Sequence, residues 1–150
     1  RGYASETFAH TMAAQILGNA RAGKHTFVYQ LGDHDPSGLD AWRDFVDKTR
    51  GFCRHDLGPD DPLAVFRRLA VTPVQVTEWD LPTRPTKTAD PRAREFAGGS
   101  VEVDAVPAST LRRLVEGAIT VLIDQEKLRL TRIAEQSERQ VLTRMVGGAP

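Results

Sequence analysis

The chain carries at residues 27–38 the stretch FVYQLGDHDPSG, which is the best guide to its architecture. The first half belongs to a run over 25–31 of mostly β-branched, aromatic and aliphatic residues that ends at Gly32. This pattern predicts a β-strand, and its near-continuous apolar character is typical of a parallel sheet covered on both faces. The second half is rich in Asp, Pro, Ser and Gly, and therefore predicts a sharp turn directly after the strand.

Helix and strand patterns alternate on both sides of this stretch. Apolar residues at helical spacing predict a helix over 4–22, with Ser5 as its N-cap, and a second helix over about 39–53. A second strand is expected around 63–71. This order of helix, strand, helix and strand predicts an α/β fold.

The C-terminal half continues the pattern less regularly. At 72–75 the residues Thr-Pro-Val-Gln predict the start of a short helix, because Thr can cap, Pro fits the first helical position and Gln can complete a capping box. A loop rich in Pro and Thr is expected over 82–99, and alternating apolar residues predict a half-exposed strand over 100–106. Pro107 opens the next predicted helix, and a long helix follows to about Met145.

The composition is that of a globular domain. With 150 residues we expect one α/β domain over 1–124 and a C-terminal helix with a frayed tail over 125–150. Lys and Arg total 20 and Asp and Glu total 20, which excludes a polybasic or acidic disordered tail. The single cysteine, Cys53, excludes an internal disulfide framework and is expected to be buried. We expect neither a membrane span nor a signal peptide, and hence a cytoplasmic protein.

Two carboxylates lie two residues apart directly after the predicted strand. In extended geometry Asp33 and Asp35 point the same way, and a divalent cation removes their mutual repulsion. Oxygen ligands favour Mg²⁺, with Mn²⁺ as a substitute, and the N-terminus of the following helix favours a phosphate. The alternative is that Asp33 caps the turn and Asp35 caps the helix, and the residues alone leave both interpretations open.

The segment 32–38, Gly-Asp-His-Asp-Pro-Ser-Gly, resembles the D-x-D motif of the Toprim fold. It is most similar to the variant in the A subunit of type IIB topoisomerases, such as topoisomerase VI. The resemblance implies a compact α/β unit with a small, mostly parallel sheet, in which Asp33 and Asp35 are catalytic and hold Mg²⁺. It also implies DNA as partner, with nuclease or topoisomerase-related chemistry on phosphodiesters. By motif it covers about residues 1–55.

The chain departs from the Toprim pattern in two ways. The family has a Glu at the end of its first core strand, a place that here falls at residues 1–3 or just upstream, and we expect the domain to lack that strand. The nearest acid is Glu6, in the first turn of the predicted helix, so either the acid is lost or a neighbour substitutes for it. Topoisomerase A subunits attack DNA with a tyrosine on a separate domain, whereas Tyr3 and Tyr29 are the tyrosines here and Tyr29 lies within the predicted strand. The alternative function is therefore a non-catalytic DNA- or protein-binding Toprim module of a larger machine. A receiver-type or flavodoxin-like domain is a third hypothesis.

Other charged residues are weaker candidates. Glu102, with Asp104 beside it on the predicted strand, would be a third metal ligand or part of a solvated face. His34, between the two acids, would touch a phosphate or point to solvent. A basic loop suits contacts to the DNA backbone, with an ordinary solvated loop as the alternative. Its cations are Arg84, Lys87, Arg92 and Arg94.

The remaining features concern surfaces. Arg67 and Arg68 are adjacent in a predicted strand, so only one can face inward, and we expect both to serve the surface rather than the site. The last helix carries charges of both signs and an apolar stripe. That stripe would pack on the sheet or against another subunit, so a homodimer or a partner domain is a possible arrangement.

Overall fold

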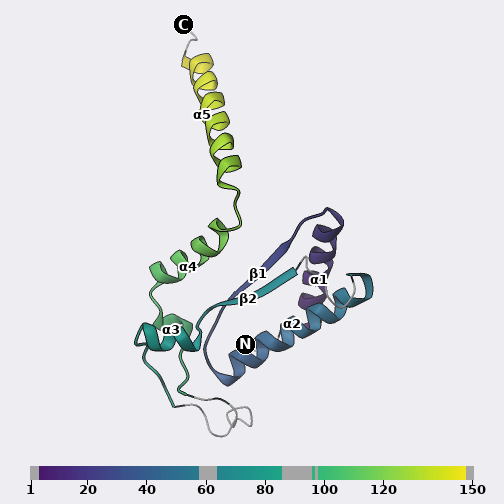
Figure 1. Ribbon diagram of the computed structural model, residues 1–150, viewed down its shortest axis with the longest axis vertical. Helices are drawn as coiled ribbons and strands as arrows, with labels where there is room; N and C mark the ends of the chain where they lie inside the picture. The colour runs from purple at the N-terminus through teal and green to yellow at the C-terminus, as the bar shows by residue number, and fades with distance from the viewer. Residues whose placement is uncertain (1–3, 58–63, 86–95, 97, 148–150) are drawn as a thin grey trace. The chain divides into compact units, whose positions relative to one another are not determined.

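The computed structural model describes residues 4–57, 64–85, 96 and 98–147, and for 55–57 the backbone only. The chain divides into two compact units, unit 1 (1–111) and unit 2 (112–150), which are described separately. In chain order the elements are α1 (Glu6–Arg21), β1 (Thr26–Leu31), α2 (Pro36–Leu57), β2 (Ala64–Ala70), α3 (Pro73–Glu78), the 3-10 helix η2 (Val103–Ala105), α4 (Ala108–Thr120) and α5 (Gln125–Gly147) (Figure 1).

The helices of unit 1 begin where their capping residues are. Ser5 is the N-cap of α1, and its Oγ accepts a hydrogen bond from the backbone N–H of Phe8 at 3.1 Å. Thr72 and Gln75 form a capping box at the start of α3, with Pro73 in the first turn. Both predicted helix starts are confirmed.

A parallel pair of strands forms the sheet of unit 1. β1 and β2 align from Thr26 opposite Ala64 to Gln30 opposite Arg68, and the register shifts by one residue before Leu31. Both strands were predicted, and the α/β class is confirmed, with a sheet of two strands in the described part of the chain.

Helices α1 and α2 cover one face of this sheet (Figure 1). Val28 of β1 and Phe66 of β2 pack against residues of both helices. Cys53, 7% exposed, is buried as predicted. The two helices contribute to the buried hydrophobic core the residues Ala9, Ala13, Ile16, Phe45, Val46 and Cys53.

The opposite face of the sheet is more open. Phe27, Leu31 and Val65 remain 38%, 40% and 40% exposed. The prediction that both faces are covered is therefore wrong for the described part of unit 1. A run of apolar residues shows a preference for burial, but it does not show which face another element covers.

The predicted strand over 100–106 is also wrong. Ser100 and Val101 each form one isolated antiparallel bridge, to Arg84 and His34, and Val103–Ala105 is a 3-10 turn. The ladder stops because the backbone partner of Val101 lies in a loop and because the N–H of Val103 donates to a side chain, Asp33 Oδ1, at 2.8 Å. Val101 is nevertheless 2% exposed, so the apolar alternation marked a buried segment.

Unit 2 contains most of α4 and all of α5. The long C-terminal helix is confirmed, and α5 carries a side-chain ion pair of Glu126 with Arg129 at 2.7 Å, as its mixed charges suggested. Among the described residues, no helix combines the length and the apolar character that a bilayer crossing requires.

Candidate functional site

The acidic loop, defined here as residues 32–35, connects the end of β1 to the start of α2. It therefore lies at the carboxyl end of a strand in a parallel sheet, and ligands of open α/β sheets bind at this edge. The N-terminus of α2, a helix of 22 residues, follows directly and adds the positive end of its dipole. The predicted position of Asp33 and Asp35 between strand and helix agrees with the structure.

Each carboxylate of the loop uses one oxygen to hold the backbone. Asp35 Oδ1 accepts the N–H of Gly38 at 2.5 Å, which is the geometry of an N-cap for α2. Asp33 Oδ1 accepts the N–H of Val103 at 2.8 Å. Within the described residues, the Oδ2 atom of each makes no hydrogen bond. Asp35 therefore caps α2, as the alternative interpretation predicted, whereas Asp33 binds a distant backbone group instead of capping the turn. One oxygen of each carboxylate is occupied in this way, and in the described part of the chain the second is not.

Gly38 is required for this compact turn. A Cβ atom at this position would lie 2.6 Å from the carbonyl oxygen of Asp33 and 3.2 Å from Asp35 Oδ1. Since 2.6 Å is far inside van der Waals contact, any side chain here would push the acidic loop away from the first turn of α2.

Arg68, on the neighbouring strand β2, binds the backbone of the acidic loop. Its Nη2 donates to the carbonyl oxygen of Gly32 at 2.7 Å and to that of Asp33. Its Nη1 donates to Gln30 Oε1 at 2.7 Å, and its Nε to the carbonyl oxygen of Val71 at 3.0 Å. Burial lowers the pKa of Arg68, while the charges of Asp33 and Asp35 act in the opposite direction.

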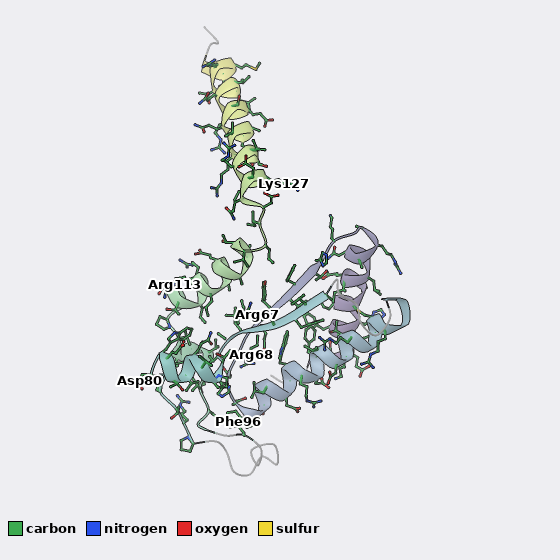
Figure 2. The ribbon with its side chains drawn as sticks, viewed as in Figure 1. Arg67, Arg68, Asp80, Phe96, Arg113 and Lys127 are labelled. Atoms are coloured by element: carbon green, nitrogen blue, oxygen red, sulfur yellow. The ribbon has the colours of Figure 1, made fainter. Side chains whose placement is uncertain are left out.

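The surface assignment of Arg68 is therefore wrong. Arg67 is exposed, whereas Arg68 is half-buried on the same face as Phe66, so only one of the two faces inward, as expected (Figure 2). The two-residue period of a strand was the available signal, because it places Arg68 on the face of the sheet that Phe66 defines.

His34, which stands between Asp33 and Asp35 in the sequence, is buried. It is 6% exposed, and its ring lies 5.0 Å from the ring of Phe96. Its backbone N–H and C=O both bond to Val101, at 2.8 and 3.0 Å, while its Nδ1 has no hydrogen-bond partner among the described residues. A contact of this side chain with a phosphate would require the ring to leave its position.

Burial of His34 predicts acid sensitivity. Desolvation lowers the pKa of His34, the charge of Arg68 lowers it further, and Asp35 opposes both. Below about pH 6.5 the imidazole of His34 is protonated in the unfolded chain but stays neutral in the folded protein. The free energy of unfolding should therefore fall as the pH drops from about 6.5 toward the pKa of His34 in the folded protein. We expect urea midpoints between pH 8 and pH 5 to decline less in His34→Gln than in the wild type. Parallel pH profiles for the two proteins would contradict this expectation.

The other predicted site residues either have partners outside the acidic loop or lie outside the described residues. Glu102 neighbours Val103, but its carboxylate pairs with Arg84 Nη1 at 2.7 Å, and both side chains are exposed. Asp104 belongs to η2 rather than to a strand face. The other cations of the predicted basic loop lie outside the described residues: Lys87, Arg92 and Arg94.

The donor set of the acidic loop fits Mg²⁺ or Mn²⁺ as a partial site. In the part of the chain that the structure describes, no three or more His, Cys, Asp or Glu side chains gather as a metal cage. Mg²⁺ usually takes one or two carboxylates and completes its octahedral shell with water and phosphate oxygens. Asp33 and Asp35 supply that number of carboxylates.

No family model, no curated protein and no solved structure matches this chain. The geometry of the acidic loop therefore carries the functional argument.

Proposed function

We propose that the chain is a Toprim-like domain that uses Mg²⁺ to act on or bind DNA phosphodiesters. One observation carries the proposal. Asp33 and Asp35 lie between the carboxyl end of β1 and the N-terminus of α2, and each has a second oxygen without a hydrogen bond in the described residues. Such a loop supports binding of a divalent cation together with a phosphate.

The residues of the chain would divide the work. Asp33 and Asp35 would hold the cation, and the positive end of α2 would favour the negative charge of a phosphate. The cation, when bound, would polarise a phosphoryl oxygen and stabilise the charge that develops during transfer. The cations Arg84, Lys87, Arg92 and Arg94 would contact the DNA backbone, and of these Arg84 already pairs with Glu102.

A non-catalytic DNA- or protein-binding module is the second candidate. Glu102 Oε1 pairs with Arg84 Nη1 at 2.7 Å, and both side chains are exposed. Within the described residues no third acid joins Asp33 and Asp35, and no general acid or base is assigned. This observation favours binding over hydrolysis in this chain.

The cation is tested with a double variant. Asp33→Asn with Asp35→Asn keeps an oxygen for each backbone N–H but removes both negative charges. We expect Mn²⁺ to raise the melting temperature of the wild type and to leave that of the double variant unchanged. Asp47→Asn, on the exposed side of α2, is the control and should respond as the wild type does. A double variant that binds Mn²⁺ as tightly as the wild type would refute the site.

Catalysis and binding are separated with supercoiled plasmid and Mn²⁺. Nicking by the wild type that disappears in the double variant supports a nuclease. Mn²⁺-dependent DNA binding without nicking supports the binding module. Nicking that survives the double substitution would mean that the acidic loop is not its source.

A further inference from the structure

We infer that Arg68 is the positioning residue of the acidic loop: it fixes the backbone that carries Asp33 and thereby sets the cation affinity of the loop. The inference rests on the proposed function for the identity of the ligand. It concerns how the two carboxylates are held, through a residue that lies on the neighbouring strand.

The position of Arg68 follows from the register of the sheet. Arg68 of β2 lies opposite Gln30 of β1, and paired residues of a parallel sheet point to the same face. The side chain of Arg68 therefore starts beside Gln30, two residues before Gly32, and reaches along β1 to the acidic loop (Figure 2).

The guanidinium of Arg68 donates its hydrogen bonds to uncharged oxygens. It donates to the carbonyl oxygens of Gly32, Asp33 and Val71 and to the amide oxygen of Gln30. None of these acceptors is a carboxylate, although Asp33 and Asp35 lie close enough for their charges to act on the pKa of Arg68. Arg68 therefore fixes the loop without occupying the oxygens that a cation needs.

Only arginine can make this set of contacts. The guanidinium is a planar fork with five N–H donors, whereas an ammonium group is a point charge on a flexible chain. Lysine at this position would keep the positive charge but lose the simultaneous hold on two backbone carbonyls.

Charge and position have opposite effects on cation binding. The positive charge of Arg68 repels a divalent cation, so a purely electrostatic role predicts that Mn²⁺ binds more tightly when the charge is removed. A positioning role predicts weaker binding when the fork is lost, whether or not the charge stays. Arg68→Lys, which keeps the charge, and Arg68→Met, which removes it, distinguish the two roles.

The test measures Mn²⁺ affinity by the electron paramagnetic resonance signal of the free ion. We expect Arg68→Lys to bind Mn²⁺ about ten-fold more weakly than the wild type, because partners that orient metal ligands typically contribute this much. Arg68→Met should also bind more weakly, and Arg67→Lys, the exposed neighbour on the same strand, should bind as the wild type does. An unchanged affinity in Arg68→Lys, or a tighter one in Arg68→Met, overturns the inference.

A second measurement works without the metal and separates the two proposals. The N–H of Val103 donates to Asp33 Oδ1, so its hydrogen exchange reports how firmly Asp33 is held. We expect faster exchange at Val103 in Arg68→Lys and unchanged exchange in Arg67→Lys. If the wild type fails to bind Mn²⁺, the proposed function is refuted, and hydrogen exchange at Val103 alone tests the positioning role of Arg68. Equal exchange rates at Val103 in the wild type and in Arg68→Lys would refute that positioning role.

A milder variant serves if Arg68→Lys does not fold. Gln30→Met removes one acceptor that orients the guanidinium and leaves Arg68 in place. We expect Mn²⁺ affinity and the protection of the Val103 N–H from hydrogen exchange to fall in Gln30→Met, as in Arg68→Lys but by a smaller factor. Wild-type values for both in a folded Gln30→Met protein would overturn the inference.

Discussion

Gly38→Ala is expected to lower the free energy of unfolding by about 1–3 kcal/mol, the usual cost of forcing an extra carbon into a packed site. The added Cβ would meet the carbonyl oxygen of Asp33 at 2.6 Å and Asp35 Oδ1 at 3.2 Å. The first of these is a backbone atom that Arg68 also holds, so the strain cannot be relieved by a side-chain rotation. We expect the acidic loop to shift and Mn²⁺ affinity to fall together with the urea midpoint.

The matched control lies on the same helix. Gly51 belongs to α2 as Gly38 does, but a Cβ there would meet nothing within 4 Å. Alanine is a better helix former than glycine, so Gly51→Ala should raise the free energy of unfolding by about 0.5–1 kcal/mol. The two substitutions are chemically identical and should have opposite signs. A stabilising Gly38→Ala would show that the loop does not approach α2 as closely as described.

Contacts between near neighbours in sequence were predictable. Ser5 caps α1 through a residue three positions later, and Thr72 and Gln75 complete a capping box across the same spacing. Such motifs depend on a few adjacent residues, so their side chains alone specify them. The order of α1, β1, α2 and β2 followed from local periodicity for the same reason.

Contacts between distant segments were not predictable in this way. Arg68 meets Gly32 across 36 positions, and Val103 meets Asp33 across 70. The two-residue period of a strand places Arg68 on the face that Phe66 defines, but only the register of β2 against β1 places it beside Gln30 and near the acidic loop. The sequence thus predicted the two acids of the candidate site but not the groups that hold them.

The segment after Gly99 shows the same limit. Its alternation correctly marked Val101 as buried, but the partner strand that a ladder would need is absent from the described residues. The segment instead attaches to the acidic loop, through the backbone of His34 and the side chain of Asp33. Periodicity records which side chains are buried, and both a strand and a bridged turn can satisfy it.

Phe45→Ala is expected to cost about 3–5 kcal/mol of the free energy of unfolding, the range for removing a buried aromatic ring. Phe45 is 7% exposed, and its ring lies 5.6 Å from that of Phe8 on α1, 5.6 Å from that of Trp42 on α2 and 6.3 Å from that of Phe66 on β2. One ring therefore joins both helices to the sheet. Since small domains are stable by only about 5–15 kcal/mol, this loss should bring the protein close to its unfolding midpoint.

Phe52→Ala is the control that removes an aromatic ring from α2 without removing the contact between α2 and the sheet. Phe52 lies on the same helix, is 37% exposed and has its ring 5.2 Å from that of His10. Because it leaves a smaller cavity, we expect its urea midpoint to fall by less than half as much as that of Phe45→Ala. The position of α2 against the sheet also sets where its N-terminus presents Asp35, so Phe45→Ala should weaken Mn²⁺ binding while Phe52→Ala should not. Equal losses of stability in the two variants would mean that α2 is not fixed to the sheet through Phe45.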